Sequence, residues 1–441
     1  MIANANACRR FSLDRRLVSR RFNGMLASKN GNLKLLFVAD VPLQNPGSGS
    51  ERILERQASG ACTKGAAVCA IVRLSKKEPA GFKKAGRIKV GQFYANPDQF
   101  WQFAYQHLKY PAYFCRKFAR HAPFSAVVAH QPFTCFALLA TGRILHTPLL
   151  YNFHSPAYEE YLLSKDHAHP LLDFFPALAR RKIERYCLRH AKSVMVESEY
   201  MKQKVSAIHA IADARIFVNP GGVDLDFFHP HADRGRLKKQ LGLPAGRIHL
   251  LTIRNLERRM GVDNLLKAAA MLKERKCPVH LVIGGAGPER QKLEELIRRY
   301  DLAATVTLTG FIPAAQLPQY YGAADLFVLP TRKLEGFGLV TVESLACGTP
   351  VMGTPVGGTR EILSGFGAEF LFRDATAAAM AEGLQVAVSQ WLSDKSRYDR
   401  LRVRCREYAA ENYSWQRHVQ ALHSNLVHLI QQRHNPKGVR H

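Results

Sequence analysis

Two glutamates, Glu335 and Glu343, stand eight positions apart at the ends of the stretch EGFGLVTVE. Two glycines, Gly336 and Gly338, follow the first glutamate, and a short apolar run leads to the second. A helix that begins near Gly338 would leave its first backbone N–H groups unpaired. The two glycines would let an anion approach those groups directly. We therefore expect an anion site at this turn, with a carboxylate on either side.

The spacing of the two carboxylates fits a particular kind of ligand. At the rise of an α-helix, they should lie about 10 Å apart. Carboxylates accept hydrogen bonds from hydroxyl groups, so a nucleoside diphosphate sugar, with its sugar, pyrophosphate and ribose in a row, matches the layout. In the alternative interpretation, Glu335 is a helix-start charge and Glu343 a solvated surface residue. Which interpretation holds depends on the strands and helices that surround the stretch.

Strands and helices alternate along most of the chain, which predicts an α/β fold with doubly wound sheets. The pattern restarts near residues 222–230, so we expect two Rossmann-like halves that face each other across a ligand-binding cleft. The first series of predicted strands covers residues 33–40, 66–73, 125–130, 148–154, 193–198 and 215–220. The second series covers residues 249–254, 278–285, 305–310, 325–330 and 349–355.

The length of 441 residues suits two domains of about 200 residues each. We expect a basic tail over 1–32, a first Rossmann-like domain over 33–225, a second over 226–412, and a final helical segment over 413–441. The longest apolar run, near 133–140, is too short to span a bilayer.

The net charge of +28 indicates attraction to polyanions such as nucleotide diphosphates, anionic lipids or phosphorylated glycans, although a basic surface can also serve solubility alone. No nucleic-acid-binding motif is recognisable, so a nucleic-acid partner is not expected. Residues 1–32 could form an amphipathic, arginine-rich helix on an anionic membrane, a transit peptide or a disordered tail. Nine scattered cysteines without a C-x-x-C pair indicate a reducing compartment, and we expect a cytoplasmic protein.

Several other nucleotide-binding motifs are absent. The loop with Gly47 and Gly49 has Arg52 where the third glycine of a dinucleotide fingerprint would stand, and the second strand ends in Arg73 instead of an acid. The chain has no P-loop sequence. The one D-x-D, at residues 224–226, falls between the two halves, and no metal site is predicted. These observations disfavour a dehydrogenase and a P-loop enzyme.

Seven blocks of the chain resemble, in order and spacing, the retaining GT-B glycosyltransferases of family 4, the group 1 glycosyltransferases of E-x7-E type. The resemblance extends from Leu33 to about residue 430. The blocks are VADVPLQNPGSGSER, YNFHSP, AKSVMVESEYM, NPGGVDLDFF, GFIPAAQLPQYYGAADLFVLP, EGFGL and GTPVMGTPVGGTREI.

The resemblance implies a role for each residue around the two glutamates. Glu335 matches the glutamate that holds sugar hydroxyls beside the anomeric carbon, and Glu343 matches the one that binds the ribose. Gly338 and Leu339 would offer backbone N–H groups to the pyrophosphate. Ile312 falls where the main chain of the family contacts the nucleobase.

Two further matches lie in the first half of the chain. Gly47 and Gly49 correspond to the loop that closes over the donor phosphates. His154 matches a histidine that projects toward the transferred sugar, although a histidine with satisfied hydrogen bonds at a strand end is the alternative. In the second half, Gly357 and Gly358 either let the chain pass close to the donor or shape a strand-to-helix turn.

The sequence departs from the family where the donor phosphates should meet an arginine and a lysine. In TIRNLERRMGVD (252–263), Asn255 and Met260 occupy the expected positions. Arg254 or Arg259 could replace them, because each supplies a permanent charge and a planar donor fork. Arg258 is a third candidate. Phosphate neutralisation is thus the part of the site that the pattern defines least.

The resemblance implies an N-terminal acceptor domain over 33–225 with substrate-specific loops around residues 91–124 and 155–176. The C-terminal nucleotide-sugar domain would cover 226–412, and the helix over 413–441 would cross back to the first domain.

The resemblance also implies a retaining hexosyltransferase that uses a UDP- or GDP-linked sugar and needs no cofactor or metal. Its acceptor would be a glycan or glycolipid in the synthesis of surface polysaccharide or lipopolysaccharide, reached from the cytoplasm or at the inner face of the membrane. The alternatives are a degenerate GT-B protein that acts as a binding scaffold and a GT-B sugar-nucleotide epimerase. A phosphorylase is disfavoured because no pyridoxal-lysine segment is recognisable.

Overall fold

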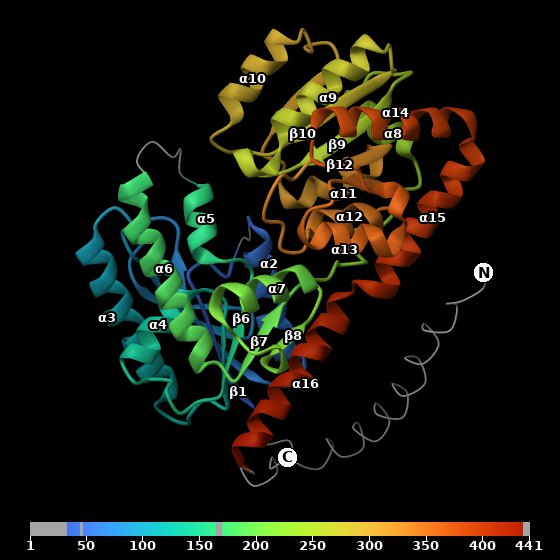
Figure 1. The fold of residues 1–441 in the computed structure, drawn as a ribbon. Helices are drawn as coiled ribbons and strands as arrows, with labels where there is room; N and C mark the ends of the chain where they lie inside the picture. Colours follow the sequence, from blue (N-terminus) through green and yellow to red (C-terminus); the bar gives the residue numbers. More distant parts are fainter. Residues whose placement is uncertain (1–32, 45–46, 165–169, 435–441) are drawn as a thin grey trace, which may run out of the picture.

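The computed structural model describes residues 33–44, 47–164 and 170–434. The predicted basic tail, residues 1–32, lies outside the described residues. Two α/β domains stand side by side, and a long helix runs from one to the other (Figure 1). The predicted α/β architecture, with two Rossmann-like halves, is confirmed.

The first domain contains an eight-stranded sheet of order β3-β4-β2-β1-β5-β6-β7-β8. All neighbouring strands are parallel except β3 and β4. Near-continuous apolar sequence explains why the central strands are buried on both faces. The strands are β1 (Lys34–Ala39), β2 (Ala67–Leu74), β3 (Gly81–Ala85), β4 (Ile88–Tyr94), β5 (Ala126–Ala129), β6 (Leu149–Asn152), β7 (Ser193–Val196) and β8 (Ile216–Val218).

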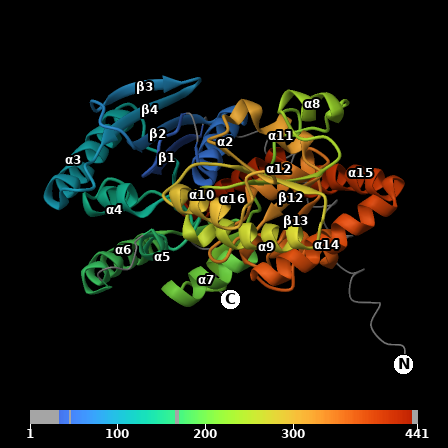
Figure 2. The same ribbon diagram turned by 90° about the horizontal axis from the view of Figure 1, so that it is seen from above.

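The helices of the first domain cover both faces of this sheet (Figure 2). They are α2 (Gly49–Thr63), α3 (Phe100–Ala119), α4 (Pro132–Ala140), α5 (Ala157–Leu163), α6 (Pro170–His190) and α7 (Glu199–His209), with a 3₁₀ turn η1 (Asp213–Arg215). The expectation of substrate-specific loops over 91–124 and 155–176 was wrong for most of these residues, because β4, α3, α5 and the start of α6 occupy them.

The hairpin of β3 and β4 was not predicted from the sequence. Strand β3 is largely exposed and carries Lys83 and Lys84, so it has no buried apolar run that would mark it. A turn through Gly86, whose φ is 58°, joins it to β4. Charged residues on an exposed edge strand are a common device against unwanted strand pairing.

The second domain contains a five-stranded parallel sheet of order β11-β10-β9-β12-β13. Its strands are β9 (Ile248–Ile253), β10 (Val279–Gly284), β11 (Val306–Gly310), β12 (Leu326–Leu329) and β13 (Val351–Gly353). Its helices are α8 (Arg234–Gln240), α9 (Val262–Glu274), α10 (Arg290–Arg299), α11 (Leu317–Ala323), α12 (Leu339–Ala346), α13 (Gly357–Phe366), α14 (Ala377–Ser393) and α15 (Lys395–Asn412), with 3₁₀ turns η2 (Arg258–Met260), η3 (Ala314–Gln316) and η4 (Ala368–Phe370). The predicted strands of this half are all present.

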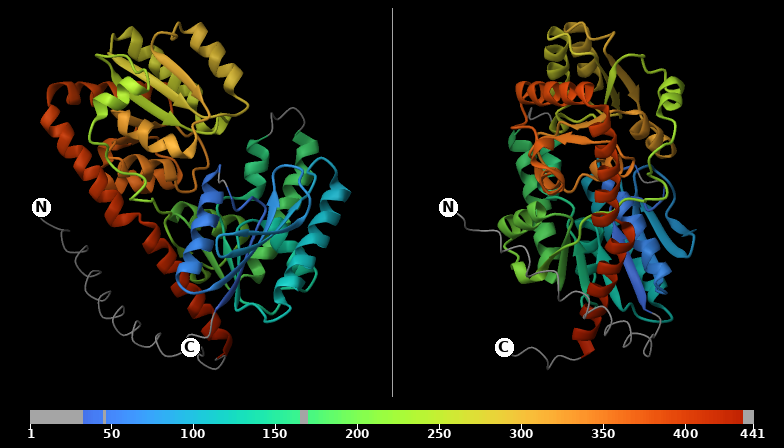
Figure 3. Two further views of the ribbon diagram at one scale, coloured as in Figure 1. Left: turned by 180° about the vertical axis from the view of Figure 1, so that it is seen from behind. Right: turned by 90° about the vertical axis from the view of Figure 1, so that its right-hand side faces the viewer.

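The last helix, α16 (Trp415–His434), leaves the second domain and lies along the first, against α2 (Figure 3). Leu422, Leu426 and Leu429 of α16 are buried in the core between the first sheet and α2. Gly60 of α2 makes this packing possible, because a Cβ there would come within 2.4 Å of the Val419 side chain. Helix α16 is thus part of the first domain's core.

The two connections between the domains touch each other. The Val223 N–H donates to the Tyr413 carbonyl over 2.7 Å. A Cβ on Gly222 would lie 2.6 Å from the backbone nitrogen of Trp415, so only glycine fits this crossing. The pair of connections therefore forms one compact joint between the domains.

Within the described part of the chain, no helix is long and apolar enough to cross a membrane.

A buried ion network at Asp325 anchors the second sheet. Its carboxylate pairs with Arg234 and Lys238 at 2.6 and 2.8 Å, lies 3.3 Å from Nδ1 of the His249 ring, and accepts the backbone N–H of His249. Burial would raise the pKa of Asp325, but the hydrogen bonds to the ring and backbone of His249 and the two cations outweigh burial and hold the pKa below its usual range. The network therefore stabilises the fold above about pH 4 and loses this contribution as the pH falls below that value.

We expect the Asp325→Asn variant to unfold with a free energy about 3 kcal/mol lower at pH 7, because two cations lose their buried partner. Denaturant unfolding measures this change. The matched control is Asp301→Asn, which removes an exposed carboxylate that pairs with Lys273 and should change stability little. Equal losses in the two variants would contradict the role of the network.

Candidate functional site

The stretch EGFGLVTVE lies at a cleft between the two domains, and its helix α12 begins at Leu339, directly after Gly338, as predicted. Both domains line the cleft, and both Glu335 and Glu343 belong to its wall. Glu335 is 9% exposed and Glu343 is 3% exposed. The interpretation of Glu343 as a solvated surface residue is therefore wrong. Two carboxylates this deeply buried require partners.

Arg254 is the partner of Glu335. Its guanidinium donates to the Glu335 carboxylate over 2.6 Å, and Thr331 donates a second hydrogen bond to the same oxygen over 3.2 Å. Met260, in the position of the expected lysine, is buried beside the same guanidinium. The Arg254 Nε is buried without a partner within the described residues. Arg254 thus neutralises Glu335 and keeps one donor unused.

Arg52 is the partner of Glu343, and it comes from the other domain. It extends from the first turn of α2 and forms an ion pair with the Glu343 carboxylate. Tyr321 of α11 donates to the second carboxylate oxygen over 3.0 Å. Burial and the nearby carboxylate raise the pKa of Tyr321, which keeps its hydroxyl protonated as a donor. The sequence placed Arg52 at a helix start but did not indicate this contact, which spans 291 positions.

The backbone before α12 is held by the glycine pair at the start of α13. The Gly358 N–H donates to the Glu335 carbonyl over 2.9 Å. A Cβ on Gly357 would lie 2.0 Å from that carbonyl oxygen, and one on Gly358 would lie 2.6 Å from the Gly336 carbonyl oxygen. The two glycines therefore shape the turn and let it pack on the Glu335 loop.

The amino end of α12 is a polar recess. Gly338 has a φ of 93°, which favours glycine. The hydroxyls of Thr341 and Thr359 are buried and lack hydrogen-bond partners among the described residues. Both hydroxyls lie within 3.2 Å of the point that a Cβ on Gly338 would occupy. Unpaired hydroxyls and the free N–H groups of a helix start together form a site suited to an anion.

The loop with Gly47 and Gly49 meets this recess from the first domain. Gly47 donates its N–H to the Glu51 carboxylate over 2.6 Å, and Ser48 and Glu51 form a capping box at the start of α2. A Cβ on Gly49 would lie 3.6 Å from the Leu339 side chain. The structure thus brings Gly47 and Gly49 of the first domain together with Gly338 and Leu339 of the second in the lining of the cleft.

His154 lies in the cleft wall, but both of its ring nitrogens have partners. Its Nδ1 is 3.1 Å from the Glu197 carboxylate, and its Nε2 is 3.0 Å from Nδ1 of His130. Burial and the neighbouring His154 and His418 lower the pKa of His130 well below its usual value, so His130 is neutral. One arrangement of protons satisfies both of these hydrogen bonds: His130 donates from Nδ1 to Nε2 of His154, and His154 donates from Nδ1 to Glu197. The sequence did not single out His130 or Glu197.

Two other residues named from the sequence also line the cleft. Arg259 donates to Glu257 and to the Leu334 carbonyl, so it fixes the loop that leads to Glu335. Ile312 is buried over Gly284, where a Cβ would come within 2.4 Å of its side chain. Its neighbour Phe311 is 69% exposed and faces the same cleft.

The domains are also joined at the amino end of α7. Glu361 of α13 accepts the backbone N–H groups of Glu199 and Tyr200 over 2.9 and 2.7 Å. Ser198 donates to the Gly336 carbonyl over 2.6 Å. Glu361 therefore caps a helix of the first domain from the second domain. These bonds hold the Glu335 loop against the first domain.

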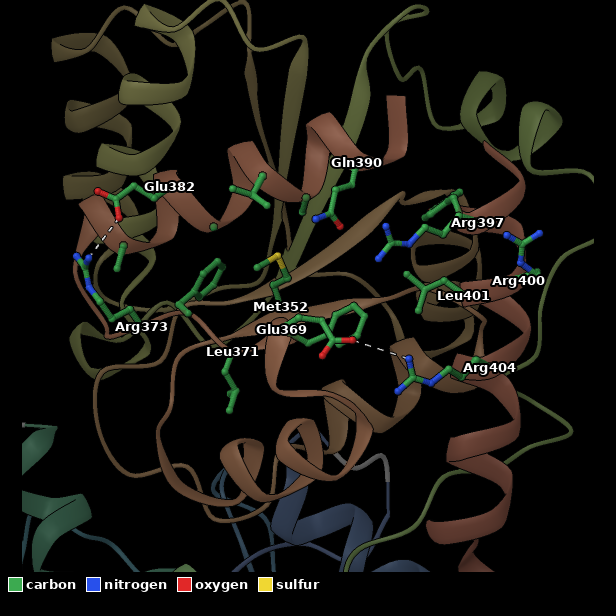
Figure 4. A pocket seen from close by; sticks show the side chains of 17 residues that line it. Met352, Glu369, Leu371, Arg373, Glu382, Gln390, Arg397, Arg400, Leu401 and Arg404 are labelled. Atoms are coloured by element: carbon green, nitrogen blue, oxygen red, sulfur yellow. Dashed lines mark ion pairs between the residues drawn. The ribbon is translucent and has the colours of Figure 1, made fainter. Parts of the chain in front are cut away.

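A second cavity lies in the second domain, between α14 and α15, with Met352 and Leu371 on its floor (Figure 4). Arg373 and Arg404 at its rim form ion pairs with Glu382 and Glu369. It contains none of the residues named from the sequence. Among the described residues, no three metal-binding side chains gather at one point.

Two family models match the chain. The model described as glycosyl transferases group 1 matches residues 233–412, and the model described as glycosyltransferase family 4 matches residues 47–227. The two matches divide close to the joint between the domains. Together they contain the two cleft glutamates, Arg52 and Arg254.

Curated relatives share about a third of the aligned residues. A D-inositol 3-phosphate glycosyltransferase of Arthrobacter sp. is 32% identical over 251 residues, which cover 56% of this chain and 58% of the relative. A GDP-mannose-dependent alpha-(1-6)-phosphatidylinositol monomannoside mannosyltransferase of Mycolicibacterium smegmatis is 32% identical over 208 residues, 44% of this chain and 52% of the relative. The matches thus span little more than half the length of these relatives.

Solved structures show the same fold at low sequence identity. A sucrose-phosphate synthase from Thermosynechococcus elongatus has a TM-score of 0.76 at 20% identity, covering 91% of this chain and all of the other. Anabaena Alr3699/HepE in complex with UDP-glucose has a TM-score of 0.67 at 19% identity, covering 90% of this chain and all of the other. The predicted GT-B fold is confirmed.

Because α13 packs closely on the Glu335 loop, a single methyl group added at Gly357 should lower the stability of the protein. We expect Gly357→Ala to destabilise the protein by about 2 kcal/mol and to displace the Glu335 loop, because its φ of 61° and the Glu335 carbonyl both exclude a Cβ. Thermal unfolding and a crystal structure of the variant measure the two effects. The control is Gly367→Ala, directly after α13, where the atoms nearest to a Cβ belong to the side-chain carboxylate of Glu369 and not to the backbone. Unchanged stability of Gly357→Ala would contradict the packing argument.

Proposed function

Because this chain belongs to the group 1, family 4 glycosyltransferases of GT-B fold, we propose that it transfers a hexose, with retention, from a UDP- or GDP-linked donor to a glycan or glycolipid acceptor. One observation carries the proposal. Two buried carboxylates, Glu335 and Glu343, line the cleft in the stretch that surrounds a helix start with unpaired polar groups. This is the order of groups along a nucleotide sugar.

The donor is assigned to the cleft group by group. Its diphosphate would bind at the amino end of α12, beside Gly338 and Leu339, where backbone N–H groups and the helix dipole favour negative charge. The sugar hydroxyls would bond to Glu335, and the ribose hydroxyls to Glu343. The nucleobase would lie by Ile312, with the exposed ring of Phe311 available for stacking.

The reaction requires charge stabilisation more than proton transfer by the protein. In the proposed step, the acceptor hydroxyl attacks the anomeric carbon from the face that the nucleotide leaves, and the departing phosphate oxygen takes the hydroxyl proton. Negative charge builds on that phosphate, so fixed N–H dipoles and cations supply the catalysis. We propose that no cofactor or metal takes part.

Arg52 is the cation that we assign to the leaving diphosphate. In the structure its guanidinium forms an ion pair with Glu343, the carboxylate that we propose binds the ribose. Ribose hydroxyls would replace the guanidinium at Glu343, and the released arginine would lie beside the loop of Gly47 and Gly49, at the diphosphate. Arg254 bonds to Glu335 and would orient that carboxylate for the sugar. This division replaces the missing arginine–lysine pair.

The acceptor and cellular role are proposed from chemistry and from relatives. The names of the relatives describe phosphorylated inositol and phosphatidylinositol mannoside as acceptors. A chain with a net charge of +28 suits an acceptor of this anionic type. We propose a role in surface polysaccharide or lipopolysaccharide synthesis, in the cytoplasm or at the inner face of the membrane.

One observation favours a second candidate, a nucleotide-binding scaffold without turnover. Met260 stands where the resemblance places a phosphate-binding lysine, and the guanidinium of Arg254 bonds to Glu335. Incubating the purified protein with UDP-, GDP- and ADP-sugars and a mixed acceptor pool separates the candidates. A glycosylated product detected by mass spectrometry supports transfer. Nucleotide binding without a product supports the scaffold, and an altered sugar nucleotide supports an epimerase.

We expect Glu335→Gln to lower kcat/KM at least about tenfold, because glutamine loses the charge that strengthens hydrogen bonds to the sugar. Glutamine preserves the size of the side chain and leaves Arg254 a hydrogen-bond acceptor, which alanine would not. The control is Glu382→Gln, which removes an exposed carboxylate outside the cleft. Wild-type transfer rates in Glu335→Gln would refute the assignment of the site.

The Arg52→Ala variant tests whether the Arg52 side chain binds the donor diphosphate or only competes with the ribose for Glu343. If Arg52 moves to the diphosphate, Arg52→Ala should weaken UDP or GDP binding and lower kcat/KM about tenfold, because a charge-assisted contact is lost. Calorimetry and steady-state kinetics measure both. The control is Arg56→Ala, one turn along α2, whose guanidinium pairs with Asp224. Tighter nucleotide binding in Arg52→Ala would show that Arg52 only blocks Glu343.

A further inference from the structure

The outward face of α3 carries an apolar stripe that no other described residue covers. Trp101, Tyr105 and Leu108 are exposed, and Trp101 is 82% exposed. Their spacing of four and three places them on one line along the helix. The opposite face of α3 buries Phe114 and Cys115 in the domain core. A contiguous exposed stripe of this kind marks an interaction surface more often than scattered apolar residues do.

The patch continues onto the neighbouring edge strand. Phe82 of β3 is half exposed, and its ring lies 6.1 Å from Tyr113 and 5.5 Å from Phe118 of α3. Lysine side chains lie over the tyrosine rings of this face: Lys109 is 5.2 Å from the Tyr105 ring, and Lys117 is 5.6 Å from the Tyr113 ring. We call the surface of Phe82, Trp101, Tyr105, Leu108 and Tyr113 the α3 face.

The charge around the α3 face is almost entirely positive. Residues 79–120 contain eight lysines and arginines and one acid, Asp98. Helix α3 itself has Lys109, Arg116 and Lys117 and no acidic residue. Such a surface is complementary to a partner that is both apolar and negatively charged.

We propose that the α3 face docks on an anionic lipid bilayer. Tryptophan and tyrosine rings suit the boundary between headgroups and acyl chains. Lysine and arginine stems can extend along the apolar surface and place their charges at lipid phosphates. A second copy of the chain fits less well, because two such basic faces repel each other.

The α3 face lies near the edge of the first sheet at which the cleft opens. Strand β4 is parallel to β2, so its carboxyl end lies at the same edge of the sheet as the cleft residues that follow β6 and β7. Helix α3 begins a few residues after β4, and Trp101 is in its first turn. The face lies at the outer edge of the first domain, away from the second (Figures 1 and 2). Docking would leave the cleft open beside the membrane surface.

Vesicle co-sedimentation of the full chain tests the proposal. We expect binding to vesicles that contain phosphatidylglycerol, weaker binding at high salt, and little binding to pure phosphatidylcholine. Trp101→Ser/Leu108→Ser and Lys109→Glu/Lys117→Glu should each lower the partition coefficient at least about tenfold. The measurement uses no donor or acceptor, so its result is independent of the proposed transfer reaction.

A charge-matched control separates the α3 face from net charge. Lys239→Glu/Lys267→Glu changes the net charge equally at exposed positions of the second domain and should bind vesicles nearly as the wild type does. Tryptophan fluorescence gives a second readout. The emission of the wild type should shift to shorter wavelength on anionic vesicles, and Trp101→Phe should remove most of that shift while vesicles still bind.

Three results would overturn the proposal. The first is equal binding of the wild type to neutral and anionic vesicles. The second is wild-type binding by both α3 variants, together with lost binding when residues 1–32 are deleted, which would assign docking to the N-terminal segment. The third is a dimer in solution that Trp101→Ser/Leu108→Ser converts to a monomer, with vesicle binding unchanged.

Discussion

Buried carboxylates require cations or hydrogen-bond donors that compensate for the water they lose. Glu335 and Glu343 meet this requirement in different ways. Glu335 takes its cation, Arg254, from its own domain, whereas Glu343 takes Arg52 from the opposite domain. The second ion pair therefore joins the two domains at the cleft as well as compensating Glu343. In the proposed function, a ribose that binds Glu343 displaces Arg52 and so removes this interdomain contact.

Much of the surrounding structure serves to keep this arrangement in place. Glycines at 357 and 358 allow α13 to pack on the Glu335 loop, and Gly222 allows the two interdomain connections to touch. Glu361 caps a helix of the first domain from the second. Close backbone contacts that leave no room for a side chain therefore recur around the cleft, which explains its short glycine-rich segments.

The sequence predicted the features that are local and periodic. Alternating apolar runs located the central strands, and the EGFG turn located the start of α12. The β3–β4 hairpin escaped because Lys83 and Lys84 hide its strand character. The partners of the cleft residues were not predicted for another reason. Arg52 meets Glu343 across 291 positions, and His130 meets His154 only because neighbouring strands end at the same edge. Contacts between residues so far apart produce no recognisable motif or periodicity in the sequence.

A crystal structure of the protein with a bound nucleoside diphosphate sugar tests most directly whether Glu335 and Glu343 hold the donor. We expect the phosphates at the amino end of α12, ribose hydroxyls on Glu343, sugar hydroxyls on Glu335, and the Arg52 guanidinium moved from Glu343 to a phosphate oxygen. A nucleotide bound elsewhere, with the Arg52–Glu343 ion pair intact, would contradict this expectation.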